Sequence, residues 1–187
     1  MVLVVFDLLA VGGSALTDLP YERRRGILEG LGIQAPGMVL TPAWAACDGA
    51  ALFAATAQQG LEGVVAKRLG SPYRPGVRSS DWVKVKHWRV GEFVVAGWLP
   101  DPGGGLRAIA LGRPGPGGLA YAGAVEFGFS RAEVHAELRG LRGKGQALIG
   151  APRGTRAVSP VLTARVRYQR LTQDGRVRAA TVVGLHR

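Results

Sequence analysis

Three charged residues have the types and spacing for phosphate chemistry. Lys84 and Lys86 stand two residues apart in Trp-Val-Lys-Val-Lys, and Glu62 precedes the run Gly-Val-Val-Ala-Lys. Two-residue spacing on a strand places both ammonium groups on one face. There they repel each other unless an anion such as phosphate lies between them. A carboxylate nearby would suit a divalent cation that bridges to phosphate oxygens. The alternative is that both lysines cover the solvent face of an edge strand.

Short apolar runs and helix signals before residue 88 predict the elements that position these residues. The predicted strands are residues 2–9, 38–40, 64–66 and 82–86. One helix is expected from Pro20 to about Leu31, with Asp18 or Thr17 as its cap, and another over residues 48–59, capped by Asp48. The strand at residues 2–9 is expected to be buried, so it needs neighbours on both sides. We interpret the arginines at 23–25 as structural ion-pair partners.

The sequence changes character after residue 88, where β-like runs alternate with turns rich in glycine and proline. These runs are residues 91–99, 106–112, 119–127, 158–162, 164–168 and 178–185. One helix intervenes, with Ser130 and Glu133 predicted to form a capping box. Several strands and one helix in about a hundred residues favour a small Greek-key barrel of the oligonucleotide-binding (OB) class. We therefore expect two domains, residues 1–88 and 89–187.

Several segments together resemble a known enzyme family. Residues 62–68, 71–79 and 81–86 are similar to nucleotidyltransferase motifs IV and V of ATP-dependent DNA ligases, especially the bacterial end-joining and stand-alone ligases. Residues 6–9, Phe-Asp-Leu-Leu, resemble motif III. Residues 168–187 resemble the approach to motif VI, with matches at Thr172, Asp174, Gly175, Arg176 and Arg178, but Ala179-Ala180 replaces the usual His-Pro.

The resemblance implies an α+β fold: the C-terminal part of a nucleotidyltransferase (ATP-grasp-like ligase) domain, followed by a small OB-fold β-barrel. It implies ATP or AMP as cofactor with Mg²⁺ or Mn²⁺, and nicked double-stranded DNA as partner. Glu62 would bind the metal, and Lys84 and Lys86 would neutralise the AMP phosphate during catalysis. Phe6 would stack on adenine, with Asp7 and Lys67 near the nucleotide. The residues expected to bind nucleic acid are Arg68, Arg74, Arg78, Arg176 and Arg178.

The ligase motif that supplies the attacking lysine, Lys-x-Asp-Gly, does not occur in these 187 residues. The Asp-Gly pairs at 48–49 and 174–175 have no lysine two positions before them. Because nucleophilic catalysis needs that amine, we expect that this chain alone cannot charge itself with AMP. The chain would then be a fragment, one half of a split enzyme whose partner supplies the missing N-terminal part, or a degenerate relative.

Composition agrees with a partner of negative charge. The net charge is +11 and the isoelectric point is near 11.0, which indicates a polyanion such as nucleic acid, although a GC-rich genome also enriches arginine. The single cysteine, Cys47, excludes an internal disulfide, and no apolar run approaches the ~20 residues of a membrane span. We expect a bacterial cytoplasmic, nucleoid-associated protein. The alternatives are a catalytically degenerate DNA-binding module and an RNA-ligase or capping-type relative.

Overall fold

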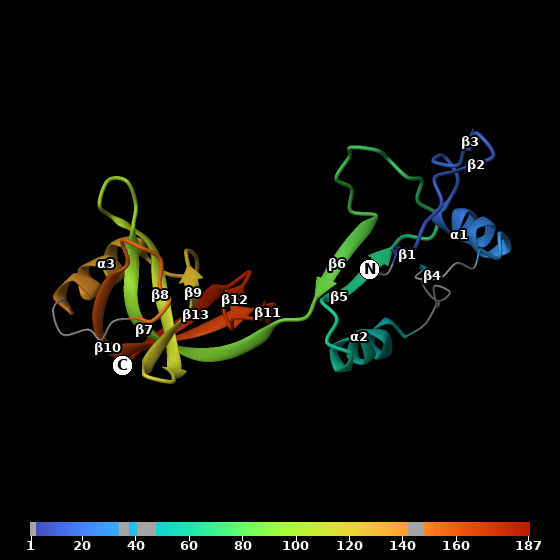
Figure 1. The fold of residues 1–187 in the computed structure, drawn as a ribbon. Coiled ribbons are helices and arrows are strands. Elements are labelled where there is room, and N and C mark those ends of the chain that lie inside the picture. The colour runs from blue at the N-terminus through green and yellow to red at the C-terminus, as the bar shows by residue number, and fades with distance from the viewer. Residues whose placement is uncertain (1–2, 34–37, 41–47, 142–147) are drawn as a thin grey trace. The chain divides into compact units, whose positions relative to one another are not determined.

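The computed structural model describes residues 3–33, 38–40, 48–141 and 148–187, and the chain divides into two compact units, Met1–His87 and Trp88–Arg187 (Figure 1). Both helices and strands occur, so the predicted mixed α and β character is confirmed. Each unit is described by itself.

Unit 1 is built from short sheets and two helices. Strand β1 (Leu3–Val5) pairs in parallel with β4 (Met38–Leu40), and β2 (Ala10–Val11) pairs with β3 (Ser14–Ala15). Helices α1 (Tyr21–Gly30) and α2 (Gly49–Gln58) precede an antiparallel hairpin of β5 (Gly63–Lys67) and β6 (Trp82–Lys86). The hairpin occupies the positions that the apolar runs predicted.

The expectation of a buried strand at residues 2–9 is wrong for the described residues. Strand β1 covers three residues, and the side chains of Leu3 and Val4 are 56% and 48% exposed. The reason is that β4 is the one strand paired with β1 in the described part of the chain, so β1 lacks the second neighbour and the covering layer that burial needs.

The first amides of α1 and α2 are hydrogen-bonded in different ways: those of α2 by a neighbouring side chain, and those of α1 by a distant segment. Asp48 caps α2 as predicted, accepting hydrogen bonds from the amides of Ala50 and Ala51 at 3.0 and 3.4 Å. The predicted capping of α1 by Asp18 or Thr17 is wrong, because Pro20 holds the N-cap position. The first amides of α1 instead donate to carbonyls of the segment after β5, Tyr21 N to Ser71 O and Glu22 N to Leu69 O. These bonds satisfy the free N–H groups that a cap would otherwise take.

Unit 2 is a five-stranded antiparallel sheet in the order β13-β10-β7-β8-β9, with helix α3 (Arg131–Gly140) packed on it. The strands are β7 (Arg89–Pro100), β8 (Leu106–Gly115), β9 (Gly118–Val125), β10 (Arg156–Tyr168) and β13 (Thr181–His186), and a small hairpin joins β11 (Arg170–Leu171) to β12 (Val177–Arg178). Trp98, Ile109 and Leu111 lie in a continuous buried core, to which Leu138 of α3 belongs. The core is the reason that these long strands hold together.

Three predictions for unit 2 need correction or stay open. The strands predicted at 158–162 and 164–168 form one strand, β10, whose register against β7 shifts between Ala157 and Leu162. Ser130 occupies the N-cap of α3, but its side chain makes no capping hydrogen bond, so the capping box is wrong. Among the described strands no ladder joins β13 to β9, so the sheet is not closed and the barrel stays a prediction.

Candidate active site

The register of the β5–β6 hairpin gathers three lysines on one face. Val65 pairs with Lys84, Gly63 with Lys86 and Lys67 with Trp82. Directly opposed residues in an antiparallel pair point to the same side of the sheet, and so do residues two apart on one strand. Lys67, Lys84 and Lys86 therefore share a face with Trp82. The spacing of Lys84 and Lys86 was visible in the sequence, whereas the position of Lys67 on the same face depends on the strand register.

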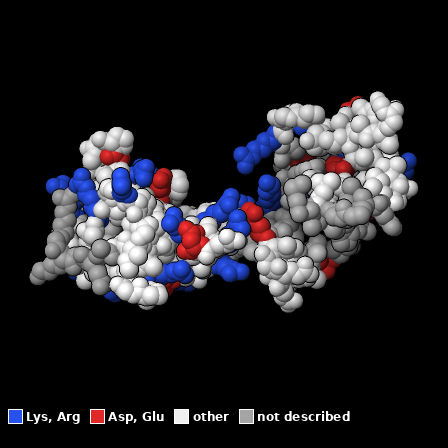
Figure 2. Space-filling model, in the orientation of Figure 1, with Lys and Arg blue, Asp and Glu red and all other residues white. Residues whose placement is uncertain are grey.

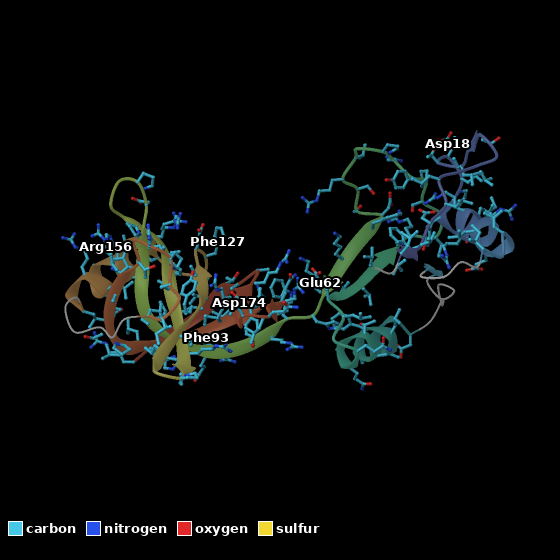
Figure 3. The ribbon with its side chains drawn as sticks, viewed as in Figure 1. Asp18, Glu62, Phe93, Phe127, Arg156 and Asp174 are labelled. Atoms are coloured by element: carbon cyan, nitrogen blue, oxygen red, sulfur yellow. The ribbon has the colours of Figure 1, made fainter. Side chains whose placement is uncertain are left out.

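Glu62 stands at the end of this lysine row. Its Oε1 atom lies 3.6 Å from Nζ of Lys86, and the carboxylate side chain is 67% exposed. The adjacent Gly63 has φ of +147°, and a Cβ at that position would overlap the carbonyl oxygen of Val85. Only glycine therefore allows β5 to begin this close to β6. Figure 3 shows Glu62 at the start of this hairpin. The hairpin thus places one accessible carboxylate beside one of the lysines.

Four aromatic rings enclose the other end of the lysine row. The rings of Phe6, Tyr21 and Tyr73 meet the ring of Trp82 edge-on, with centroid separations of 6.2, 6.2 and 5.8 Å. A hollow of about 300 Å³ borders this cluster, with Phe6, Tyr73 and Trp82 in its lining. The ring of Phe6 is 45% exposed. A flat apolar group could therefore reach one face of this ring.

Lys67 points its ammonium group into the aromatic cluster. Nζ lies 4.2 Å from the ring centroid of Phe6, 4.6 Å from Trp82 and 4.8 Å from Tyr21, and it donates a hydrogen bond of 3.3 Å to the Tyr21 hydroxyl. The pKa of Lys67 is lowered to about 8, mainly by burial; Asp7 opposes this shift, whereas the nearby Arg25 and Arg24 contribute to it. A bound phosphate beside this group would favour its charged form.

Lys67 is expected to titrate near neutral pH rather than as an ordinary lysine. The lowered pKa of about 8 means that the unfolded chain binds more protons than the folded chain between that value and 10.5, so stability rises with pH across this window. Lysine ¹³Cε chemical shifts followed by NMR over that range should show one midpoint near the lower value, assigned by its loss in Lys67→Met. The Lys67→Met chain should also lack the rise in stability. A Lys67 midpoint at the ordinary value of lysine would contradict the expectation.

Asp7 is held by a buried arginine. Arg24 donates from Nε and Nη2 to the two carboxylate oxygens of Asp7, each at 2.9 Å, and both side chains are buried. Nη1 of Arg24 donates to the carbonyls of Leu19 and Ser71, at 2.6 and 3.1 Å. The arginine is thus a structural ion-pair partner, as interpreted from the sequence. No spacing in the sequence pointed to Asp7 as the partner.

The structure places the arginines that were predicted to bind nucleic acid in both units. Arg74 and Arg78 are exposed on the connection between β5 and β6, and Arg68 is exposed with its Nε 3.5 Å from Asp81 Oδ1. Arg176 and Arg178 are exposed at the β11–β12 hairpin of unit 2. Residues 88–187 carry 15 of the 24 basic residues but 6 of the 13 acidic ones, so positive charge is concentrated there. Figure 2 shows the distribution of charged side chains on one face.

The described residues hold no cluster of three or more metal-ligating side chains and no helix that could span a membrane. No group of three or more His, Cys, Asp or Glu side chains there could hold a metal ion by itself. His87 stacks on Phe53, with centroids 3.9 Å apart, and hydrogen-bonds to Thr56 Oγ1 at 2.9 Å, which explains its place in unit 1. No helix in the described ranges is long and apolar enough to span a bilayer. A cation at Glu62 would therefore need oxygens from a bound phosphate to complete its coordination.

Comparison with protein families gives a match over unit 1. The model described as the ATP dependent DNA ligase domain matches residues 1–86. The multifunctional non-homologous end joining DNA repair protein LigD of Mycobacterium tuberculosis H37Rv is 40% identical over 193 residues, which covers 96% of this chain and 25% of that protein. LigD of Pseudomonas aeruginosa is 37% identical over 97% of this chain and 23% of its own length. The chain spans about a quarter of these relatives.

Solved structures extend the likeness to both units. The ligase domain of M. tuberculosis LigD is 38% identical, with a TM-score of 0.51, and the match covers 98% of this chain and 62% of that one. A Lig E DNA ligase, described as binding DNA with a minimal scaffold, has a TM-score of 0.63 at 18% identity over 97% of this chain and 62% of that one, which shows a shared fold.

Proposed function

Because this chain belongs to the ATP-dependent DNA ligase family, we propose that it acts in the sealing of nicks in duplex DNA. The proposed step is the last one, in which the 3′-hydroxyl oxygen attacks the 5′-phosphate and AMP leaves. The observation that supports it is the lysine row on the β5–β6 hairpin, with Glu62 beside Lys86 at 3.6 Å.

Each residue of the hairpin face has a proposed task in that step. Lys84 and Lys86 supply fixed positive charge where negative charge grows on the phosphate of the departing AMP. Phe6 offers an accessible ring to adenine, and Lys67 lies next to that ring at 4.2 Å. Asp7, engaged by Arg24, acts by holding the strand end that carries Phe6 rather than by direct contact.

Glu62 is the proposed ligand for Mg²⁺ or Mn²⁺. Proteins usually hold Mg²⁺ through one or two carboxylates, together with substrate phosphates and water. The exposed carboxylate of Glu62 fits this kind of site. When bound, the metal would act as a Lewis acid on phosphoryl oxygens. The 3.6 Å contact with Lys86 partly balances the carboxylate charge.

The domain assignment is part of the same proposal. Residues 1–88 would be a partial adenylation domain and residues 89–187 an OB-fold domain. Supporting the barrel, the strand order β13-β10-β7-β8-β9 leaves β13 and β9 as the two edges, and Val182 N of β13 donates to Phe127 O just after β9 at 3.0 Å. That bond brings the two edges together at one end, as closure of a small barrel requires.

Charging with AMP is proposed to need residues beyond these 187. The sealing of an already adenylated nick needs no lysine attack, so it is the step that this chain's own residues can carry. Several apolar side chains of unit 1 are exposed: Leu3, Val4, Val65, Val83 and Val85. Their exposure supports the proposal that another protein segment covers them, from a partner chain or a longer form. By analogy with the relatives, the work would be repair of the bacterial chromosome, in the cytoplasm at the nucleoid.

The second candidate function is a DNA-binding module without chemistry. The concentration of basic residues in unit 2 favours it, because binding to phosphates needs positive charge but no catalytic carboxylate. Dependence on Glu62 and on Mg²⁺ separates the two functions.

The test uses a nicked duplex that already carries AMP on its 5′-phosphate, with Mg²⁺ and without ATP. The full chain should join the strands, and Glu62→Ala should slow joining by about 10²–10³-fold, the usual effect of removing one transition-state stabiliser. Glu22→Ala, which removes an exposed carboxylate from α1, is the matched control. Tight binding to the nick without any joined product would favour the binding module.

A further inference from the structure

The β11–β12 hairpin of unit 2 sets two arginines directly against each other. Arg170 and Arg178 are register partners in this antiparallel pair, and both side chains are exposed. Like charges directly opposite each other on a sheet destabilise it. An anion between the two guanidinium groups offsets this repulsion. The pairing therefore indicates a place for an anion.

Two more arginines lie at the turn of the same hairpin. The guanidinium of Arg113, from β8, covers Gly175, where φ is +74° and a Cβ would overlap that guanidinium. Arg176 lies over the ring of Tyr121 on β9, with Cζ 5.3 Å from the centroid. Strands β8 and β9 thus contribute to a cationic surface that the hairpin alone does not form.

Asp174 is the carboxylate at the turn of this hairpin, beside Arg176 and Arg113. Its Oδ2 lies 2.8 Å from Nε of Arg176, and it accepts a hydrogen bond from the Thr172 hydroxyl. The Thr172 hydrogen bond lowers the pKa of Asp174, and Arg176 and Arg113 add to the lowering. Figure 3 places Asp174 at the hairpin, and Figure 2 shows basic side chains beside the acidic patch there. Arg176 and Arg113 act on this carboxylate, and Arg170 and Arg178 add two more guanidinium groups to the hairpin, so the surface keeps an excess of positive charge.

The hairpin is held in place before any ligand arrives. Val177 of β12 packs against the core of unit 2. The turn is closed by Gly175 N to Thr172 O and Thr172 N to Arg176 O, both at 2.8 Å, and by Arg176 N to Thr172 Oγ1 at 3.0 Å. A surface that is already ordered loses less entropy on binding.

We propose that Arg113, Arg170, Arg176 and Arg178 form a clamp for the phosphodiester backbone of nucleic acid. The planar guanidinium forks match phosphate oxygens in pairs, and they contact the backbone without selecting a base sequence. The motif comparison indicated Arg176 and Arg178, but Arg113 and Arg170 had no sequence signal. The clamp rests on the proposed function only for the choice of a nicked duplex as probe.

The test measures binding of a fluorescein-labelled nicked duplex to the full chain by anisotropy, over a range of salt concentrations. Each backbone contact contributes about 5-fold to affinity near 0.15 M salt, so Arg170→Ala with Arg178→Ala should weaken binding about 25-fold. The slope of log affinity against log salt should become shallower by about 1.8. Arg139→Ala with Arg153→Ala, two exposed arginines on α3 and in the loop before β10, removes the same charge and should change affinity much less.

Asp174→Asn provides a change of opposite sign. It keeps a side chain that can accept from Thr172 but releases Arg176 from its ion pair, so binding should tighten about 5-fold. The clamp is overturned if the Arg170 and Arg178 double variant binds like its control, or if the native chain does not bind the duplex. The clamp is also overturned if the double variant no longer binds ATP but still binds the duplex, because the arginines would then bind a nucleotide.

The joining assay on the same preparations separates this inference from the proposed function. A chain that binds through the clamp but never joins the adenylated nick supports the clamp and refutes the ligase step. The other outcome is that the native chain joins the nick and that its double variant binds and joins like the control. This result would refute the clamp and support the ligase step.

Discussion

Replacing Lys84 and Lys86 together by methionine is expected to slow the joining of a pre-adenylated nick by at least about 10³-fold. The two side chains share one face of β6, and their proposed task is to stabilise charge that develops as AMP departs. Methionine keeps the length of the side chain while removing the ammonium group, so the β5–β6 pairing should persist. The loss should therefore appear in the rate of the bound complex more than in the affinity for DNA.

The measurement is single-turnover joining at saturating protein, with duplex affinity determined in parallel. Arg23→Met with Arg139→Met, two exposed arginines of α1 and α3, is the control for lost charge. If the two lysines served only as solvent-exposed edge residues, the double variant would join at nearly the native rate. That result would remove the lysine row from the mechanism.

Removing the carboxylate of Asp7 is expected to destabilise unit 1 by about 3–5 kcal/mol, because it leaves the buried guanidinium of Arg24 without its partner. Asp7→Ala breaks two hydrogen bonds of 2.9 Å from Arg24 and one of 2.8 Å from Leu8 N. Arg24 also donates to the carbonyls of Leu19 and Ser71, so the disturbance should spread to the segment after β5.

Hydrogen exchange of the α1 amides as a function of denaturant reports the stability of unit 1 separately from unit 2. The exposed Asp18→Ala is the matched control, and should change that stability by less than about 0.5 kcal/mol. A double replacement, Asp7→Leu with Arg24→Met, should recover much of the loss, since removing both charges of a buried pair costs far less than removing one. Equal losses in Asp7→Ala and Asp18→Ala would show that the pair is not a structural anchor.

Several local signals in the sequence predicted their elements correctly, although the capping box at Ser130 did not form. The alternation Trp-Val-Lys-Val-Lys predicted β6 with its bounds, and Asp48 was recognised as the cap of α2, because strand periodicity and capping depend on neighbouring residues. The run of residues 106–112 likewise predicted the position of β8.

Features that depend on distant residues could not be predicted in the same way. The amides at the start of α1 are satisfied by carbonyls of residues 69 and 71, so the polar residues before the helix were misleading. Lys67 owes its lowered pKa mainly to burial, in a position where it contacts rings from three other segments. Arg170 meets Arg178 only through the register of a two-residue ladder. The roles of the site residues were predicted from motif resemblance.

Gly63, next to the proposed metal ligand, sets a limit on how this site can evolve. Every missense change in a glycine codon introduces a Cβ, and at this position any Cβ would overlap the main-chain oxygen of Val85. In α1, by contrast, a Cβ at Gly26 or Gly30 would meet nothing within 4 Å, so those positions are free to drift. Substitution next to the proposed metal ligand would thus be selected against at a residue that has no side chain and takes no part in the reaction.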